Sequence, residues 1–288
     1  MKQKKAKKAS RLAEIWRNYR RNKTAMFGLA ILVILILVVV FADLIVDYDK
    51  GIAQNAAIRL TKPCKEYIFG TDYCGRDVFA RIIHGSRASL IIGVATTVLS
   101  LIIGGTLGAV AGYYGGKIDN IIMRIMDIFM CVPALLLALA VVAALGSSTV
   151  NLIIAMAVST TPGYARIVRS SLLSVSNQDF IEAAKSYGCS DFRIVFKYIV
   201  PNAMGPIIVQ ATMGIASIIL SAAALSYLGM GVQAPAPEWG SMLSEARDFM
   251  QGSPYLLYIP GVAIVLSALA FNLAGDGLRD AMDPKLRR

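Results

Sequence analysis

The sequence is poor in the residues that most catalytic sites require. It contains a single histidine, His84, which excludes the two-histidine HExxH zinc motif, and no pair of carboxylates within an apolar run suggests a membrane protease. The segment GYYGGK at residues 112–117 resembles a phosphate-binding loop, but that motif requires glycine at Ala111 and Ser or Thr at Ile118. The chain therefore shows no catalytic residue and no nucleotide-hydrolysing site of its own.

Charged residues are also scarce. Only 16% of the residues are charged, 56% are hydrophobic, and the mean hydropathy is +0.61, which is typical of a polytopic membrane protein. The first apolar run is too long for the core of a cleaved signal peptide, and no small-x-small cleavage site closes it. We predict an all-α polytopic membrane protein with six transmembrane helices, near residues 25–46, 88–112, 120–145, 150–168, 206–229 and 254–275.

Much of the basic charge behind the formal net charge of +11 precedes the first apolar run. The basic residues there are Lys2, Lys4, Lys5, Lys7, Lys8, Arg11, Arg17, Arg20, Arg21 and Lys23. A flank of this kind stays on the cytoplasmic side of a membrane. It has few interleaved aromatics and precedes a membrane-length span, which argues against nucleic-acid binding. We therefore expect a basic cytoplasmic N-terminus (1–24), an extracytoplasmic loop (47–87), a cytoplasmic segment (169–205) and a cytoplasmic tail (277–288).

Glycines recur at four-residue spacing in the second predicted span, at Gly104, Gly108 and Gly112. Small residues on one helix face let a second backbone approach closely, so the spacing predicts a helix–helix contact. The alternative is that glycine is simply common in membrane helices. Both interpretations concern packing and not chemistry.

The third predicted span begins with charged residues, among them Asp119, Arg124 and Asp127. We expect its first turns to lie at the cytoplasmic interface, with Arg124 and Asp127 paired at i, i+3. Pro133 should kink or restart the helix before it crosses the membrane, because proline removes one helical hydrogen bond. A proton relay through Asp127 is the functional alternative, but a relay requires more ionisable groups at membrane depth than the chain supplies.

A charged segment, EAAKSYGCSDFRIVFKYIVPN at residues 182–202, interrupts the apolar runs. Asn177 or Asp179 can cap a short helix that Gly188 ends in a left-handed conformation. A second helix should begin near Ser190 and continue to Pro201. Its single apolar face would consist of Phe192, Val195, Phe196 and Ile199.

These two helices would lie across the cytoplasmic membrane surface. Glu182, Ala183 and Ala184 would sit on a small, exposed first helix, where small side chains permit close docking into a groove of another protein. Glu182 would fix the register through a charge-assisted contact. The alternative is an amphipathic connector that only rests on lipid.

This segment closely resembles the EAA motif of permease subunits in bacterial ABC importers, which forms the coupling helix that docks onto the ATPase. The resemblance implies ATPase-coupling roles for Glu182, Ala183, Ala184, Lys185, Tyr187 and Gly188. The family pattern ends in I-x-L-P, whereas here Tyr198 stands at the expected isoleucine, Ile199 comes one residue later, and Val200 replaces leucine. These departures put fine contacts in doubt and not the motif.

Further stretches narrow the resemblance to the C-type permease of the peptide/nickel importer subfamily. They are IFGTDYCGRDVFARIIHGSRASL (68–90), MRIMDIFMCVPALLLALAVVAALG, LSYLGMGVQAPAPEWGSML and GDGLRDAMDPKLRR. The subfamily implies a type I importer fold with one N-terminal helix and a five-helix core, here residues 88–276, in a bacterial cell membrane with both termini cytoplasmic. It also implies four kinds of partner: a homologous B-type permease, two ATPase subunits, an extracytoplasmic binding protein and the lipid bilayer. ATP and Mg would bind to the ATPases, and no cofactor would bind to this chain.

The resemblance implies a peptide importer, with nickel or another small solute as the alternative substrate. A secondary transporter would instead show paired discontinuous helices or intramembrane charges, which we do not find, and a membrane enzyme would need a nucleophile and a base together. No His/Cys cluster with metal-ligand spacing occurs within the membrane runs.

Two further sets of residues follow from their positions. Ser159, Thr160, Thr161 and Gln210 are candidate polar residues of the translocation path, although hydroxyls that only pack helices together would look the same. Cys64 and Cys74 lie in the predicted external loop, where a disulfide can persist, and we predict that they pair. Cys131 and Cys189 should remain reduced.

Overall fold

The computed structural model describes residues 11–282, and its regular elements in that range are all helical. In chain order they are α1 (Arg11–Tyr19), α2 (Lys23–Val40), α3 (Ala42–Ile45), α4 (Tyr48–Ile52), the 3-10 turn η1 (Ala56–Ile58), α5 (Val78–Tyr114), α6 (Gly116–Met130), α7 (Ala134–Leu145), α8 (Thr149–Ser176), α9 (Asp179–Ser186), α10 (Asp191–Arg193), the π-helix η2 (Ile194–Ile199), α11 (Val200–Tyr227), α12 (Trp239–Ala246), the 3-10 turn η3 (Arg247–Phe249) and α13 (Tyr255–Met282). The basic residues Lys2 to Lys8 and the predicted basic tail beyond 282 lie outside the described residues.

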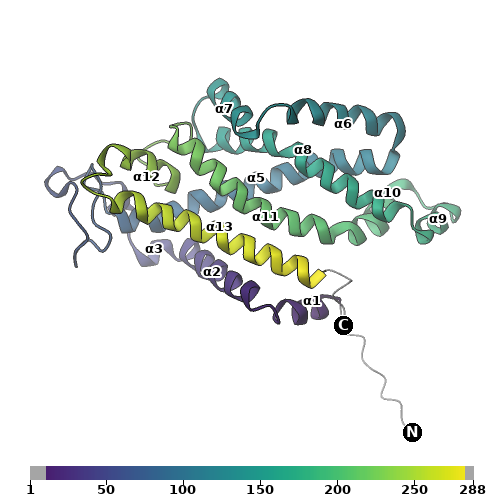
Figure 1. Ribbon diagram of the computed structural model, residues 1–288, viewed down its shortest axis with the longest axis horizontal. Helices are drawn as coiled ribbons and strands as arrows, with labels where there is room; N and C mark the ends of the chain where they lie inside the picture. Colours follow the sequence, from purple (N-terminus) through teal and green to yellow (C-terminus); the bar gives the residue numbers. More distant parts are fainter. Residues whose placement is uncertain (1–10, 283–288) are drawn as a thin grey trace, which may run out of the picture.

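The long helices run along the long axis of an elongated molecule (Figure 1). α9 and α10 lie at one end, and α1 and the end of α13 lie in the same half (Figure 1). α12 and the segment between α3 and α5 lie at the opposite end (Figure 1). The predicted cytoplasmic segment and the predicted external loop are therefore separated by the length of the helices.

Four continuous helical stretches are long and apolar enough to cross a membrane: α2, α5, α10–α11 and α13. α6 and α7 form a fifth span if they are taken together, although they are bent by 84°. The predicted count of six is not confirmed, because α8 carries two arginines and a run of hydroxyl residues and falls short of the same apolar character. The chain is nevertheless a multi-pass helical membrane protein.

Two predicted boundaries change in the structure. α5 begins at Val78, ten residues before the predicted span, because Asp77 caps it by accepting a hydrogen bond from the Phe79 amide at 2.9 Å. The predicted external loop 47–87 therefore includes the first turns of α5. The predicted break before the crossing at Pro133 is confirmed, since α6 ends at Met130 and α7 starts at Ala134.

The predicted pairing of Arg124 with Asp127 is wrong. Asp127 instead pairs with Arg166 of α8, at 2.5 Å, and Asp119 pairs with Arg169 of the same helix. α6 turns its acidic residues toward α8, where two arginines are available, and leaves Arg124 exposed. These are ion pairs between helices that the spacing within one helix does not reveal.

The glycine contact predicted in α5 is confirmed, and its partner is α8. A Cβ built on Gly108 would lie 2.2 Å from the Ala165 carbonyl oxygen, and one on Gly104 would lie 2.5 Å from the Thr161 carbonyl oxygen. No side chain fits at these distances, so glycine is required for the two backbones to touch. α5 and α8 consequently form a closely packed pair at the centre of the molecule.

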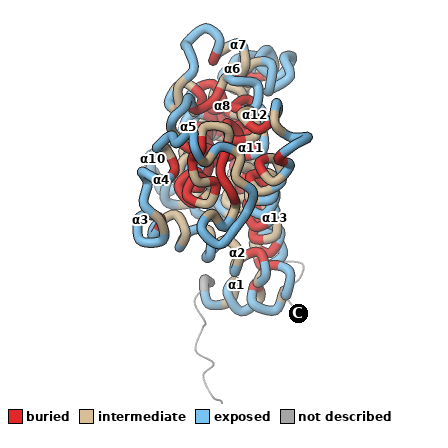
Figure 2. Tube along the Cα trace, turned by 90° about the vertical axis from the view of Figure 1, so that its left-hand side faces the viewer, coloured by how far each residue is buried: buried red, intermediate tan, exposed pale blue. Residues whose placement is uncertain are grey.

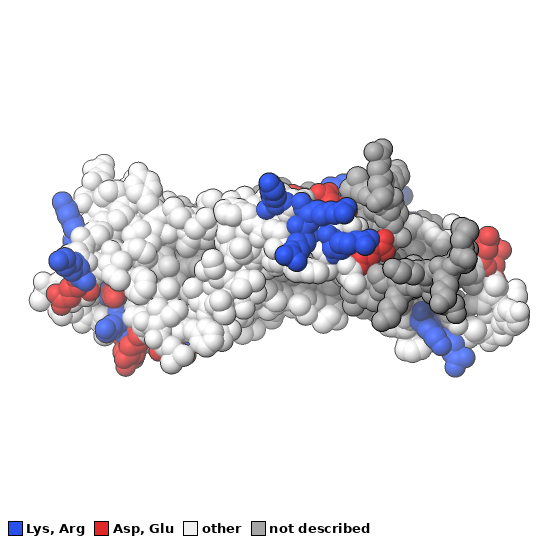
Figure 3. Space-filling model, turned by 90° about the horizontal axis from the view of Figure 1, so that it is seen from below, with Lys and Arg blue, Asp and Glu red and all other residues white. Residues whose placement is uncertain are grey.

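Buried residues gather around α5, α8 and α11, whereas α2, α3, α6 and α7 lie at the periphery and are largely exposed (Figure 2). Seen from below, charged side chains gather at the left end, in a basic cluster near the middle and toward the right end, and a wide uncharged stretch separates the left end from the middle cluster (Figure 3). An uncharged stretch between two charged zones is what a membrane-spanning surface requires.

Candidate functional site

The short helix α9 stands between the long helices α8 and α11 at one end of the molecule (Figure 1). The predicted caps are wrong: Asn177 closes α8 and Asp179 lies inside α9, so the N-cap is Gln178, whose side chain makes no capping bond. The predicted end is confirmed, because Gly188 has a φ of +71° and the Cys189 amide donates to a carbonyl one turn back at 3.2 Å.

α9 has a packed inner face and an exposed outer face. Ile181 is fully buried and Ala184 is 8% exposed, and both pack against residues of α8, η2 and α11. The prediction that Ala184 is exposed is therefore wrong, because it lies three residues after Ile181 on the same side of the helix. Glu182, Ala183 and Lys185 face outward. The outer face thus presents one carboxylate beside a small side chain and a lysine.

We call α9 the first arm of this segment and α10 with η2 the second arm. The second arm leads into α11 without a break. In the wide turn of the π-helix, a spacing of five residues places Ile194 and Ile199 on one side, and both are fully buried. The predicted single apolar face is wrong, because Ile199 is buried whereas Phe192 and Phe196 are 73% and 59% exposed, with ring centroids 4.5 Å apart. Pro201 does not end the helix, because η2 continues through it into α11.

Tyr113, at the end of α5, contacts both arms. Its hydroxyl donates to the Asp191 carboxylate at 2.6 Å, and the Lys185 ammonium lies 5.7 Å from the centroid of its ring. Beyond these contacts, Tyr187 is 87% exposed and Gly188 has open space around it. The arms are thus attached to the central helix pair, and the turn that joins them is free to contact another molecule.

A cavity of about 370 Å³ lies between the α6–α7 break, α8 and α11. Three of the four predicted path residues, Ser159, Thr160 and Gln210, line it. Thr161 does not: its side chain is 7% exposed, and its hydroxyl donates to the Ala157 carbonyl at 2.7 Å. Three of the four candidate path residues therefore lie at this cavity, and Thr161 does not.

The cavity lining is mostly apolar, with a few polar side chains and no charged ones. The Ser159 hydroxyl donates to the Met156 carbonyl at 2.9 Å, which leaves its lone pairs as acceptors. The Thr160 hydroxyl donates to the same carbonyl at 2.8 Å and is also hydrogen-bonded to the Ser100 hydroxyl at 2.7 Å. The hydroxyl of Tyr164, a lining residue that is 5% exposed, has no hydrogen-bond partner among the described residues. The lining contains no Asp, Glu, Lys, Arg or His, so it offers hydrogen bonds without offering an ion pair.

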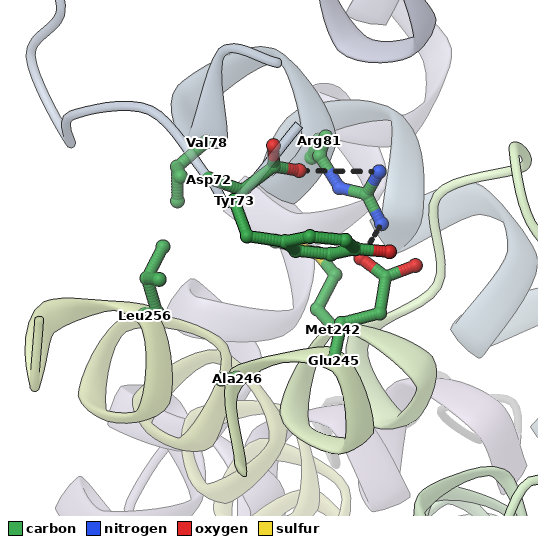
Figure 4. Close-up of a pocket in the computed structure, with 8 residues that line it drawn as sticks. All are labelled: Asp72, Tyr73, Val78, Arg81, Met242, Glu245, Ala246 and Leu256. Atoms are coloured by element: carbon green, nitrogen blue, oxygen red, sulfur yellow. Dashed lines mark hydrogen bonds and ion pairs between the residues drawn. The ribbon is translucent and has the colours of Figure 1, made fainter. Parts of the chain in front are cut away.

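The opposite end of the molecule holds a buried group of four charged residues, Asp72, Arg76, Arg81 and Glu245, which we call the clasp. Figure 4 shows Arg81 between Asp72 and Glu245. Arg76 lies 2.6 Å from Asp72 and 2.5 Å from Glu245, and Arg81 lies 3.0 Å from Glu245. Burial opposes the charge on Arg76, but Glu245 and Asp72 outweigh it and raise the pKa of Arg76 above its ordinary value.

α12, which carries Glu245, is also fixed at its start. Glu238 caps it by accepting from the amides of Gly240 and Ser241, each at 2.8 Å. Ser89 of α5 donates to the same carboxylate at 3.0 Å, and the Trp239 indole donates to the Ile82 carbonyl at 3.1 Å. The clasp and this cap together attach α12 and the segment before α5 to the same helix.

The predicted disulfide between Cys64 and Cys74 is not formed in the structure, where both are free thiols. Each residue is held by its own turn. The sulfur of Cys64 accepts from the Tyr67 amide at 3.4 Å, and the Cys74 amide donates to the Asp72 carboxylate at 2.8 Å.

Residues 104–288, more than half of the chain, match the family described as binding-protein-dependent transport system inner membrane component. The chain belongs to this family of membrane permeases. Residues 10–63 of the permease also match the N-terminal TM domain of oligopeptide transport permease C. The proposed alternatives of a secondary transporter and a membrane enzyme receive no support from this membership.

Curated relatives cover nearly the whole permease. It is 47% identical over 274 residues to the dipeptide transport system permease protein DppC of Alkalihalophilus pseudofirmus, covering 95% of this chain and 90% of that protein. It is 43% identical to the di/tripeptide transport system permease protein DppC of Pseudomonas aeruginosa, covering 96% and 93%. It is 45% identical to the glutathione transport system permease protein GsiD of Escherichia coli, covering 95% and 90%.

Among solved structures, the permease resembles a chain of the inward-facing MetNI methionine ABC transporter. The TM-score is 0.59 at 20% identity, and the match covers 71% of this chain and 98% of that chain. This likeness confirms the predicted type I importer permease fold.

Sequence reasoning missed several residues of the permease that the structure brings together. Tyr113 and the clasp arginines Arg76 and Arg81 were given no role of their own, because their partners lie far along the chain. A partial signal existed for the clasp, since Asp72 and Arg76 are four residues apart in a segment with several charges. No comparable signal identified Tyr164, which looks like an ordinary aromatic of a buried helix.

Proposed function

We propose that this permease is one of two homologous membrane subunits of an ATP-driven importer of di- and oligopeptides. In this proposal a B-type permease supplies the other half of the path, an extracytoplasmic binding protein delivers the substrate, and two ATPase subunits drive the cycle. The chain itself is non-catalytic, and ATP and Mg bind to the ATPases. The α9 end and both termini face the cytoplasm of a bacterial cell.

The observation that carries the proposal is that α9 has one face packed against the long helices and one face exposed. Its inner face is packed through Ile181 and Ala184, so a force applied to its exposed outer face must move α8 and α11 with it. Glu182 and Ala183 supply a charge and a close-approach position for an ATPase groove. Lys185, Tyr187 and Gly188 form the exposed end of the same contact. ATP-driven closure of the ATPases would then move α9 and rock the two permeases between inward- and outward-facing states.

The assignment of peptides rests on the relatives and on the cavity. The relatives reported above are named for dipeptide, di/tripeptide and glutathione transport, which are all peptide substrates. The cavity beside Ser159, Thr160 and Gln210 offers uncharged hydrogen-bonding groups, which suit the amide groups of a peptide backbone. We place these three residues on the translocation path.

The test is reconstitution of the complex in vesicles with its cognate binding protein. We expect ATP-dependent uptake of labelled dipeptide and co-purification of the ATPases and a second permease. Uptake of nickel without uptake of peptide would refute the peptide assignment. A stable, active homodimer without ATPases would refute the importer assignment.

Glu182→Lys tests the coupling contact. Reversing a charge at a protein–protein contact should lower ATPase co-purification and binding-protein-stimulated turnover by roughly tenfold or more. Glu66→Lys, the same reversal on an exposed residue of the opposite end, is the matched control and should leave ATPase association unchanged. Normal association of the Glu182→Lys permease would contradict the coupling role of α9.

A further inference from the structure

A groove with charged walls adjoins the uncharged cavity. It lies between α6 and α8, has a volume of about 520 Å³, and includes the two interhelical ion pairs Asp127–Arg166 and Asp119–Arg169. Ile167 lines both the cavity and the groove, so the two spaces share a wall. A solute that leaves the cavity along α8 toward the α9 end therefore meets charged side chains at this point.

The two ion pairs differ in construction. Arg169 contacts both oxygens of Asp119, through Nε at 2.5 Å and through a second bond from Nη2, and the Asp119 side chain is only 16% exposed. Arg166 reaches Asp127 through a single bond at 2.5 Å, and the two side chains are 47% and 42% exposed. Among the described residues, the side chain of neither Asp127 nor Arg166 makes another hydrogen bond. The Asp119–Arg169 pair therefore links α6 to α8 through two bonds. The Asp127–Arg166 pair leaves N–H donors of Arg166 and one carboxylate oxygen of Asp127 unused.

We propose that Asp127 and Arg166 form an exit site for a zwitterionic solute: Asp127 binds its ammonium group and Arg166 binds its carboxylate. This proposal rests on the proposed peptide transport, because a free peptide carries both groups. A peptide in the uncharged cavity has no partner for its termini there, and the Asp127–Arg166 pair is the first that it meets on the way to the α9 end. Exchange of partners costs little, because an ion pair exposed to solvent is only weakly stabilising. The unused guanidinium N–H groups of Arg166 match the two oxygens of a carboxylate.

The test uses the complete complex in vesicles that contain ATP, with the binding protein outside. The lumen, which corresponds to the cytoplasmic side, is loaded with either dialanine or its N-acetylated, C-amidated derivative, and inhibition of labelled dialanine uptake is measured. We expect dialanine to inhibit roughly tenfold more strongly than the uncharged derivative, as two weak ion pairs would give. In the variant Asp127→Asn with Arg166→Gln, this difference should disappear.

The matched control is Asp119→Asn with Arg169→Gln, which removes the same charges from the other pair. It should lower the stability of the permease and keep the preference for dialanine as the inhibitor. The proposal is overturned if the Asp127/Arg166 variant keeps the preference, or if the control variant loses it to the same extent. Absence of dialanine uptake by the wild-type complex would instead overturn the proposed peptide function itself.

If the variant Asp127→Asn with Arg166→Gln transports nothing, a second variant that keeps both charges decides the question. Asp127→Glu with Arg166→Lys retains the ammonium and carboxylate partners but replaces the planar guanidinium. It should restore uptake together with a preference for dialanine. Restored uptake without the preference would show that the pair only ties α6 to α8, and would overturn the exit site.

Discussion

Replacing Glu245 by glutamine should loosen the segment before α5 without unfolding the membrane core. Glu245 is the acid that both clasp arginines share, and it comes from α12, far along the chain from Arg76 and Arg81. Glutamine keeps the shape and one acceptor oxygen but removes the charge. Two arginines that are each 1% exposed would then share a single acid, Asp72, and one buried positive charge would be uncompensated.

The magnitude follows from the burial of the group. Removing one partner of a buried ion pair costs about 3–5 kcal/mol, and the lower end applies because the Glu245 side chain is 18% exposed. At 1.4 kcal/mol per factor of ten, about 3 kcal/mol corresponds to a roughly hundredfold larger population of the locally open form. Hydrogen exchange of the amides that close this turn reports that population. Among them, Asp72 donates to the Arg76 carbonyl at 3.0 Å and Gly75 donates to the Asp72 carbonyl at 2.9 Å.

The assay is hydrogen exchange with mass spectrometry on the permease in lipid discs. Peptides that cover residues 70–78 should exchange roughly a hundredfold faster in Glu245→Gln, whereas peptides from the centres of α5 and α8 should not change. Asp248→Asn is the matched control, because it removes an exposed acidic charge three residues later. Equal exchange in Glu245→Gln and wild type would refute the argument that charge pairing in the clasp holds this segment.

Three further predictions use single positions. Gly188→Val should reduce coupled transport and leave membrane insertion intact. A Cβ at this position meets nothing within 4 Å, so the only penalty is the left-handed backbone, about 1–2 kcal/mol. Gly188→Asn should be tolerated in the same uptake assay, because asparagine adopts this conformation more readily. Gly108→Leu should abolish assembly, as judged by the yield of intact complex, because its Cβ would meet the α8 backbone at 2.2 Å; Gly105→Ala, whose nearest neighbour would lie at 3.8 Å, should assemble normally. Alkylation of the unreduced protein should label both Cys64 and Cys74, and a linked peptide in the mass spectrum would instead support the disulfide.

Features set by neighbours in sequence could be predicted well. The four-residue spacing of Gly104 and Gly108, the break at Pro133 and the left-handed end at Gly188 each depend on a property of one residue or one helix face. Ser159, Thr160 and Gln210, which interrupt long apolar runs, share one cavity in the structure, and their predicted place on the translocation path stays a prediction.

Features that depend on distant partners could not be predicted. Asp127 had an arginine at helical spacing in Arg124, yet its partner is Arg166, and nothing in the order of residues distinguishes the two. The π-helix is the reason that the apolar face of the second arm was predicted wrongly. A period of 3.6 residues groups Phe192 with Phe196 and Ile199. The wider turn of the π-helix instead buries Ile194 and Ile199 and leaves both phenylalanines exposed. Periodicity assumes regular geometry, and it fails where the geometry changes.

The break between α6 and α7 changes which groups line the cavity. Pro133 has no N–H, so the Phe129 carbonyl, on a residue that lines the cavity, lacks the donor that a straight helix would supply four residues later. The Phe129 carbonyl therefore stays a hydrogen-bond acceptor whichever side chains surround it. Substitutions along this wall can change the size and shape of the cavity while the Phe129 carbonyl persists, so the cavity can be reshaped without the gain of a new polar side chain.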